Sequence, residues 1–185
     1  MNVPNFLTSL RLLAIPVFVA LFLQGRLGAA LAVFVGAMIT DVLDGIAARL
    51  LKQFTALGAI LDPVADKLIS LTALVLLCWS RRLPRWLFWL LIFREVCIFA
   101  AVAILTRTGR AYEIRPTRFG KYATACLAAT MILALVQGAR GVSPGPAVIA
   151  LALVSAQCIF VSWAQYLVIF IHLMRRPPQS GPASA

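Results

Sequence analysis

The chain has 185 residues, of which 62% are hydrophobic and only 12% are charged. A soluble domain is about half apolar and about a quarter charged, so this composition excludes an ordinary soluble domain and indicates apolar surface placed in lipid. The net charge is +11, with 17 Lys and Arg against 6 Asp and Glu, but the basic residues lie between apolar segments. With no basic run and no aromatic platform for bases, the pattern argues against nucleic-acid binding and indicates residues that flank a membrane or contact anionic headgroups and phosphates.

Six apolar segments follow one another, and each is close to the roughly 20 residues that a helix needs to cross a bilayer. They cover approximately residues 6–24, 28–50, 60–80, 84–106, 118–138 and 146–174. Turn residues separate them at Gln24-Gly25-Arg26, Arg81 to Pro84, Gly109-Arg110 and Gly141 to Pro146. Lipid permits only helices or closed barrels, and the period-2 alternation of barrel strands is absent. We therefore expect an all-α, polytopic membrane protein with about six transmembrane helices.

The sequence predicts a distinct structure for each end of the chain. Asn2 to Arg11 resembles a short N-terminal interfacial helix, which Pro4 could start. We expect the first segment to be retained rather than cleaved as a signal peptide, because no basic residue precedes Arg11. Residues 1–175 would form one membrane domain, and the Pro-, Ser- and Gly-rich residues 176–185 a disordered cytoplasmic tail.

The positive charges predict an orientation. Six spans place both termini on one side of the membrane. That side would hold ten basic residues: Arg11, Arg49, Lys52, Arg107, Arg110, Arg115, Arg118, Lys121, Arg175 and Arg176. The other side would hold five: Arg26, Arg81, Arg82, Arg85 and Arg140. Because basic residues are enriched in cytoplasmic loops, both termini are expected in the cytoplasm, although the segment Arg81 to Arg85 counts against this orientation.

The cysteines and the histidine do not indicate a metal site or a catalytic site. The four cysteines are far apart in sequence, and none lies beside the single His172: Cys78, Cys97, Cys126 and Cys158. A zinc site needs clustered Cys and His ligands, so we expect none. The cysteines are expected to be small apolar helix residues, and histidine-based catalysis is not expected.

Four of the six acids are grouped in or beside the second and third apolar segments: Asp41, Asp44, Asp62 and Asp66. Residues three or four apart share a helix face, so each pair projects from one face of its helix. The short linker Leu51 to Leu57 makes the two helices antiparallel neighbours, and the pairs can then face each other near the cytoplasmic end. Four carboxylates at low dielectric would repel one another, and divalent cations would remove the conflict. Oxygen-only ligands suit Mg²⁺ or Mn²⁺.

The residues between these acids suit a phosphate-containing ligand. Gly45 and Gly58 permit a close approach, Ala48 keeps the helix face slim, and Arg49 offers a planar fork for a phosphate. Metal ions and phosphate together indicate phosphoryl or nucleotidyl transfer. Two other interpretations are open. The acids could form intramembrane ion pairs with basic residues of the same helices, namely Arg49, Lys52 and Lys67, or they could serve an ion-coupled membrane transporter as a proton or cation relay. The lack of an inverted repeat weighs against the transporter.

A resemblance now becomes visible. The pattern is Asp41-x-x-Asp44-Gly45-x-x-Ala48-Arg49, then eight residues, then Gly58-x-x-x-Asp62-x-x-x-Asp66. It resembles the signature of the CDP-alcohol phosphotransferase family at all eight positions and spacings. The six apolar segments agree, so the resemblance extends over residues 1–175.

The resemblance implies a reaction and a site. Such enzymes cleave the pyrophosphate of a CDP-linked alcohol, transfer its phosphoalcohol to an acceptor hydroxyl and release CMP. By position, Asp41, Asp44, Asp62 and Asp66 would bind two divalent metal ions, and Asp66 would also be the general base. The CDP site would be shaped by Thr8, Gly45, Ala48, Arg49 and Gly58. Family members are commonly homodimers, so a homodimer in the bacterial inner membrane is expected.

Further motifs bear on donor and acceptor. The opening Asn2 to Thr8 with Arg11 and Pro16 resembles the phosphatidylglycerophosphate synthases and cardiolipin synthases of this family, and so does the run from Leu61 to Lys67, which suggests CDP-diacylglycerol as donor. The pair Arg94-Glu95 resembles the first group, although Cys97-Ile98-Phe99 is unusually apolar and Ala123 replaces a common lysine.

These motifs favour some acceptors over others without identifying one. We expect glycerol 3-phosphate first and phosphatidylglycerol second, and then serine, inositol phosphate or a CDP-amino-alcohol route. The segment Arg118-x-Gly120-Lys121 with Thr124 resembles one found in both groups. Basic residues at the cytoplasmic mouth of the site would bind an acceptor phosphate, and the candidates are Arg94, Arg110, Arg115, Arg118 and Lys121. The alternative is that the loop residues only flank the membrane and that Arg94 and Glu95 form a partly buried pair.

Overall fold

The computed structural model describes the backbone of residues 3–51, 56–108 and 117–175, and the side chains of residues 11–40, 67–108 and 117–175. The described part contains six α-helices: α1 (Val3–Leu23), α2 (Leu27–Leu51), α3 (Ala56–Trp79), α4 (Arg85–Arg107), α5 (Arg118–Ala139) and α6 (Pro146–Arg175). No strand occurs among these residues. The predicted all-helical fold is confirmed, and each predicted segment corresponds to one helix, with ends that differ by at most four residues.

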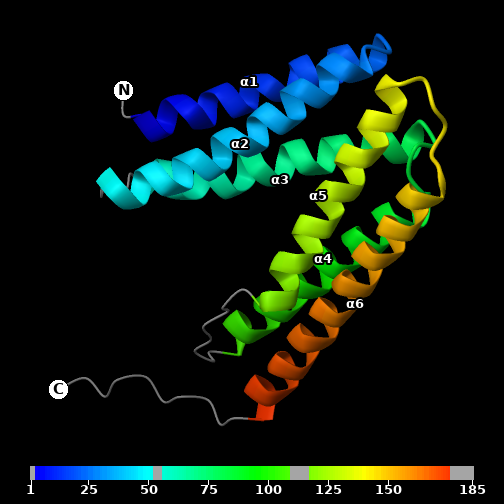
Figure 1. Ribbon diagram of the computed structural model, residues 1–185. Helices are drawn as coiled ribbons and strands as arrows, with labels where there is room; N and C mark the ends of the chain where they lie inside the picture. The colour runs from blue at the N-terminus through cyan, green and yellow to red at the C-terminus, as the bar shows by residue number, and fades with distance from the viewer. Residues whose placement is uncertain (1–2, 52–55, 109–116, 176–185) are drawn as a thin grey trace.

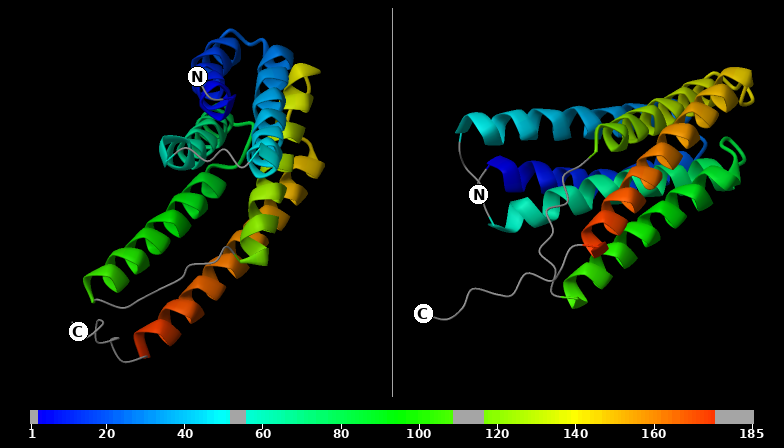
Figure 2. Two further views of the ribbon diagram at one scale, coloured as in Figure 1. Left: turned by 90° about the vertical axis from the view of Figure 1, so that its left-hand side faces the viewer. Right: turned by 90° about the horizontal axis from the view of Figure 1, so that it is seen from below.

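The helices form two groups that cross. Helices α1, α2 and α3 run nearly alongside one another, and α4, α5 and α6 run obliquely to them (Figure 1). Helix α5 packs on α6 and also on α2, while α4 packs mainly on α6 (Figure 2). The C-terminal ends of α2, α4 and α6 lie towards the same end of the bundle as the N-terminal ends of α1, α3 and α5 (Figure 1). We call this end the aspartate end, because it carries the ends of α2 and α3 nearest the four aspartates.

The opposite end is built from tight turns. Gly25 and Gly141 adopt positive φ angles of 74° and 70°, a left-handed conformation that glycine adopts without steric cost. Arg81 has a φ of 58° in the turn between α3 and α4, although it carries a side chain. The turns predicted at residues 24–26, 81–84 and 141–146 are therefore confirmed, while the turn predicted at Gly109-Arg110 lies outside the described residues.

Membrane-spanning character is clear in the second group of helices. Within the described residues, α4, α5 and α6 are long and apolar enough to cross a bilayer, and three shorter apolar stretches cover Arg11–Leu23, Leu27–Thr40 and Lys67–Trp79. Large apolar side chains of α4 and α6 point outwards, for example Trp89 (65% exposed), Phe99 (68%) and Val168 (66%). Such a surface is suited to lipid contact, in agreement with a polytopic membrane protein.

Small residues and a hydroxyl pair between α5 and α6 help to hold the interior together. On α6 the buried residues Val148, Ala152, Ser155, Ile159 and Ser162 recur every three or four positions and form one face. The Oγ atoms of Thr130 on α5 and Ser155 on α6 lie 2.9 Å apart in the interior. Small side chains let membrane helices approach closely, and a hydroxyl pair then adds a directional contact.

The N-terminal prediction needs correction in one respect. The expected interfacial helix at Asn2 to Arg11 is not a separate element, because α1 continues without a break from Val3 to Leu23. Pro4 lies in the first turn, where no backbone N–H is needed within the helix, and no glycine interrupts the segment before Arg11. The tail, residues 176–185, lies outside the described residues.

Candidate active site

The four aspartates lie on the backbone of α2 and α3, and their side chains fall outside the described residues. Their positions along the two helices can still be compared. With a rise of about 1.5 Å per residue, Asp41 stands about 15 Å before the end of α2, and Asp66 about 15 Å after the start of α3. The corresponding values for Asp44 and Asp62 are about 10 Å and about 9 Å. The two pairs therefore occupy matching levels on helices joined by a four-residue connection, residues 52–55.

The expected CDP-binding residues share this part of the chain. Thr8 lies on α1, Gly45, Ala48 and Arg49 lie on α2, and Gly58 lies on α3. Their surroundings are likewise outside the described residues. Helix α1 packs against both α2 and α3, so the three helices that carry the motif are direct neighbours.

A charged cluster connects the helix that carries Asp62 and Asp66 to α4. Lys67 Nζ on α3 lies 2.7 Å from Glu95 Oε2 on α4, and Arg94 Nη1 lies 2.7 Å from Glu95 Oε1. Glu95 thus accepts from two cations, one on each carboxylate oxygen. The Lys67 side chain is 65% exposed, whereas that of Arg94 is only 11% exposed. The partly buried Arg94–Glu95 pair, which the sequence left open as the alternative to acceptor binding by Arg94, is therefore present.

Arg94 reaches from α4 to α5 and α6. Its Nη2 lies 3.5 Å from the Ser162 hydroxyl, and it would lie 3.7 Å from a Cβ added at Gly120. That added Cβ would also lie 3.1 Å from Thr117 Oγ1 and 3.4 Å from Ser162 Oγ. A Cβ at Gly120 would therefore crowd the Thr117 hydroxyl most closely, while the Arg94 guanidinium lies at an ordinary contact distance where three helices meet. The Thr117 hydroxyl caps α5 by accepting a 3.1 Å hydrogen bond from the Gly120 N–H.

Two polar atoms beside this junction have no hydrogen-bond partner in the part of the chain that the structure describes. They are Arg94 Nε and Gln165 Oε1, both buried. Gln165 follows Ser162 by three residues on α6, so both lie on one face of that helix. A buried donor or acceptor without a partner costs roughly 1–3 kcal/mol, and a ligand that supplied the missing hydrogen bond would be favoured.

None of the other acceptor candidates whose side chains the structure describes is buried as Arg94 is. Arg118 and Lys121 are exposed at the start of α5, and Arg110 and Arg115 lie outside the described residues. The Thr124 hydroxyl donates to the carbonyl oxygens of Gly120 and Lys121 at 3.3 and 2.9 Å, so it is engaged within its own helix.

Two features of the aspartate end were not predicted from the sequence. Arg11 was expected to flank the membrane, but it is buried, at 2% exposed. It stands about 12 Å from the start of α1, close to the level of the aspartates on the adjacent helices. The link between Lys67 and Glu95 was also missed, because 28 residues separate them. Of the basic residues weighed as ion-pair partners of the aspartates, Lys67 pairs with Glu95, and the aspartate side chains lie outside the described residues. Arg49 and Lys52 lie outside the described residues.

The comparisons with known proteins agree with this arrangement. Residues 1–174 match the CDP-alcohol phosphatidyltransferase family. A CDP-diacylglycerol–glycerol-3-phosphate 3-phosphatidyltransferase of Pectobacterium atrosepticum is 35% identical over 184 residues, which cover 95% of this chain and 98% of the relative. A cardiolipin synthase (CMP-forming) of Streptomyces coelicolor is 39% identical over 115 residues, 59% of this chain and 54% of the relative.

Some other matches are shorter. A CDP-diacylglycerol–glycerol-3-phosphate 3-phosphatidyltransferase of Pseudomonas fluorescens is 54% identical over 80 residues, 42% of this chain and 41% of the relative. The chain therefore matches about half the length of the Streptomyces and Pseudomonas relatives, but nearly all of the Pectobacterium relative. The family match, by contrast, extends over almost every residue of the chain. The chain belongs to the CDP-alcohol phosphatidyltransferase family.

Proposed function

We propose that the protein transfers the phosphatidyl group of CDP-diacylglycerol to the hydroxyl of glycerol 3-phosphate and releases CMP. The observation that carries this proposal is the similarity to a glycerol-3-phosphate phosphatidyltransferase over 98% of that relative's length. The matching levels of the two aspartate pairs on α2 and α3 support it, because the reaction requires several carboxylates around one pyrophosphate.

The proposed chemistry needs a base and a stabilised leaving group. The acceptor oxygen attacks the phosphorus that bears the diacylglycerol, the bond from that phosphorus to the bridging oxygen breaks, and this oxygen leaves with CMP. Asp66 takes the proton of the acceptor hydroxyl. Asp41, Asp44, Asp62 and Asp66 would hold two Mg²⁺ or Mn²⁺ ions, for which an all-oxygen donor set is suitable. When bound, these ions supply positive charge that neutralises the pyrophosphate and the departing CMP.

The CDP moiety is assigned to the faces of α1, α2 and α3 near the aspartates. Gly45 and Gly58 would allow close approach, Ala48 would keep the groove open, and Arg49 and Thr8 would donate to phosphate or ribose oxygens. The packing of α1 on both other helices supports this assignment, because it brings the three parts of the motif together.

The acceptor phosphate is assigned to Arg94. Its guanidinium is buried, lies beside Ser162 and Gly120, and keeps one Nε–H without a partner in the described structure. A phosphate oxygen would satisfy this donor through a charge-assisted hydrogen bond. The outer candidates Arg110, Arg115, Arg118 and Lys121 would draw the anion towards the site without contacting it when it is bound.

A second acceptor also has an observation in its favour. The similarity to a cardiolipin synthase of Streptomyces coelicolor, at 39% identity, favours phosphatidylglycerol. The same donor, base and metal ions would serve that reaction, because only the alcohol changes.

The setting is proposed from the charge pattern. The aspartate end would face the cytoplasm of a bacterial inner membrane, with both termini and the tail 176–185 on that side, because more basic residues lie there. The active form would be a homodimer of a single membrane domain, residues 1–175.

The test is CMP release by the purified protein in detergent, with CDP-diacylglycerol and Mg²⁺. Glycerol 3-phosphate, phosphatidylglycerol, serine and inositol phosphate are supplied singly, and Asp66→Asn is the control. Release with glycerol 3-phosphate that is lost in the variant supports the proposal. Release only with phosphatidylglycerol would move the assignment to the second acceptor. No release with any acceptor, from protein that remains folded, would refute the transferase and leave ion-coupled transport to be measured in proteoliposomes.

A further inference from the structure

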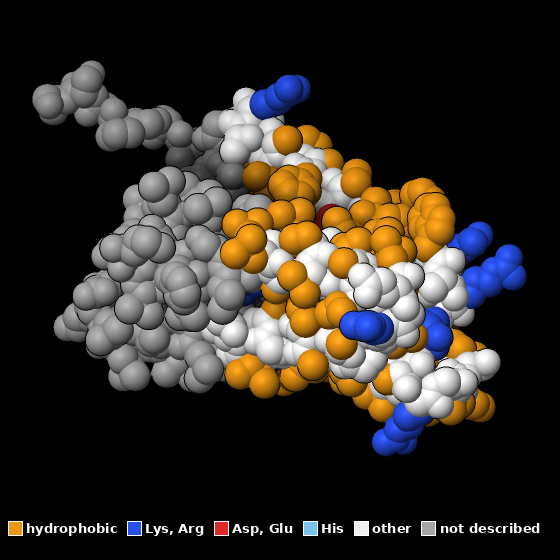
Figure 3. Space-filling view, turned by 90° about the horizontal axis from the view of Figure 1, so that it is seen from above, with side chains coloured by type: hydrophobic (Ala, Val, Ile, Leu, Met, Phe, Trp, Pro, Cys, Tyr) orange, Lys and Arg blue, Asp and Glu red, His pale blue; other side chains and the backbone are white. Residues whose placement is uncertain are grey.

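A pocket lies at the end of the bundle opposite the aspartates. It has a volume of about 600 Å³ and is lined by the turn between α3 and α4 together with the start of α6. Three arginines contribute to it: Arg81, Arg82 and Arg85. In Figure 3, most of the visible Lys and Arg side chains stand at this end of the molecule. We call this feature the Arg81 pocket.

The positive charge of the pocket is not compensated within the described structure. No acidic residue lines it, and the three arginine side chains make no ion pair or hydrogen bond with the described residues. The one acidic side chain that the structure describes, Glu95, is engaged by Lys67 and Arg94. Helix α4 begins beside the pocket at Pro84 without a side-chain cap, which adds the positive end of a helix dipole. The pocket therefore favours an anion from outside the chain.

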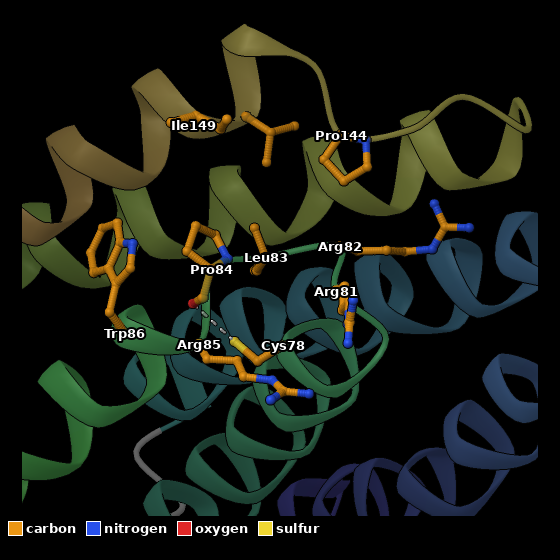
Figure 4. Close-up of a pocket in the computed structure, with 10 residues that line it drawn as sticks. Cys78, Arg81, Arg82, Leu83, Pro84, Arg85, Trp86, Pro144 and Ile149 are labelled. Atoms are coloured by element: carbon orange, nitrogen blue, oxygen red, sulfur yellow. Dashed lines mark hydrogen bonds between the residues drawn. The ribbon is translucent and has the colours of Figure 1, made fainter.

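The arginines divide into two kinds. Arg82 extends away from the other two (Figure 4), and its Nη1 would lie only 2.6 Å from a Cβ added at Gly138. It is therefore packed over the end of α5. Arg81 and Arg85 are exposed and line the pocket. Arg81 also holds a left-handed conformation, where the turns at Gly25 and Gly141 use glycine. A strained residue with a long charged side chain at such a position points to a role for that side chain.

The opposite wall of the pocket is apolar. Trp86, Pro144 and Ile149 line this wall, and Pro144 and Ile149 lie on the other side of the pocket from Arg81 and Arg85 (Figure 4). Trp79, Trp86 and Trp89 are 68%, 43% and 65% exposed, and exposed tryptophans mark the headgroup level of a membrane. A free phosphate ion would use only the charged wall. A phospholipid would place its phosphate on the arginines and its glycerol and upper acyl carbons on the apolar wall.

We propose that the Arg81 pocket binds the phosphate of an anionic phospholipid from the leaflet opposite the aspartates, with Arg81 and Arg85 as its ligands. The inference rests on the charge, the pocket and the tryptophans of this end, and it stands whether or not the proposed reaction at the other end is correct. The bound lipid neutralises a group of positive charges that no residue of the described chain neutralises.

The test uses the full-length protein in neutral detergent and measures retained lipid by native mass spectrometry. The lipids are phosphatidylglycerol and phosphatidylcholine of identical acyl chains, supplied at equal concentration. The variant is Arg81→Gln/Arg85→Gln. Its matched control is Arg26→Gln/Arg140→Gln, which removes the same charge from the same end but outside the pocket. Inorganic phosphate and soluble glycerol phosphate are added as competitors, and helix content by circular dichroism checks folding.

The expected result is preferential retention of phosphatidylglycerol, weakened about 30-fold by the double substitution in the pocket and little by the control, since each basic residue near a membrane contributes about a fivefold preference. Three results would overturn the proposal: equal loss in both double variants, unchanged retention in the pocket variant, or equal retention of the two lipids. Complete displacement by inorganic phosphate at the concentration of the lipid would overturn the assignment to a lipid. If the pocket variant loses helix content, Arg81→Lys/Arg85→Lys replaces it. The site is supported if this variant retains phosphatidylglycerol at the wild-type level and inorganic phosphate displaces the lipid only in part.

Discussion

Replacing Arg94 by glutamine separates a structural role from a role in acceptor binding. The change removes the buried guanidinium that donates to Glu95 at 2.7 Å and lies 3.5 Å from Ser162. Breaking a fully buried ion pair costs about 3–5 kcal/mol. Glu95 is 26% exposed and keeps Lys67 at 2.7 Å, so the loss is closer to that of one hydrogen bond to a charged group, about 1.5–3 kcal/mol.

The kinetic consequence is larger and more specific. If Arg94 holds the acceptor phosphate, Arg94→Gln raises the KM for glycerol 3-phosphate roughly 10- to 100-fold, because one charge-assisted contact is lost. The KM for CDP-diacylglycerol stays within a factor of two or so, since Arg94 is not assigned to the donor. Arg94→Lys keeps the charge but not the planar fork, so it recovers only part of the affinity.

The assays are CMP release at varied acceptor concentration and unfolding of the detergent-solubilised protein by sodium dodecyl sulfate. Lys67→Gln is the matched control, because it removes the other cation from Glu95 while leaving Arg94 in place. Since Lys67 is 65% exposed, its loss should cost at most about 1 kcal/mol and leave the acceptor KM nearly unchanged. A stability loss in Arg94→Gln with an unaltered acceptor KM would refute the binding role. Equal kinetic effects of the two variants would refute it as well.

Three further predictions concern packing and the metal ions. Gly138→Val should lower stability by about 1–3 kcal/mol, because a Cβ there would lie 2.7 Å from Leu27 Cδ1, on a buried side chain, as well as 2.6 Å from Arg82 Nη1. Gly36→Val, which has open space, should cost less, and equal losses in the same unfolding assay would contradict this packing. A double-mutant cycle of Thr130→Val and Ser155→Ala should give a coupling energy of about 0.6 kcal/mol, and a value of zero would show that the 2.9 Å contact does not stabilise the helix pair. Chelation of divalent ions should abolish CMP release and added Mg²⁺ should restore it, so activity that persists in the chelator would contradict the carboxylate site.

The helices could be predicted from the sequence because each apolar segment is long and the polar turns are short. The start of α3 was placed at residue 60 rather than Ala56, since apolar content alone does not mark a helix end. The prediction of a separate helix at Asn2 to Arg11 was wrong for a related reason. A change from interfacial to buried surroundings does not interrupt the backbone hydrogen bonds of a continuous helix, so composition suggested a boundary that the chain does not have.

The candidate site could be predicted only where its residues are close in sequence. The spacing of Asp41 and Asp44, and of Asp62 and Asp66, follows from the helical repeat. The contact of Lys67 with Glu95 depends on how α3 lies against α4, which no local pattern specifies. Gly120 was noticed as part of a motif, but its place beside the Thr117 hydroxyl, Ser162 and the guanidinium of Arg94 depends on how three helices lie together.

The two ends of the bundle also bear on the orientation of the chain. Counting basic residues gave ten on the aspartate side and five on the other, and three of those five line the Arg81 pocket. If Arg81 and Arg85 bind an anionic lipid, as proposed, their charge is neutralised in the membrane and no longer counts against a cytoplasmic aspartate end. Arg11 must also be left out of the ten basic residues counted on the aspartate side, because it is buried and does not face the headgroups. The remaining bias is stronger than the original one, at nine against three. Two of the charges that made the orientation ambiguous are therefore those to which we assign a different role.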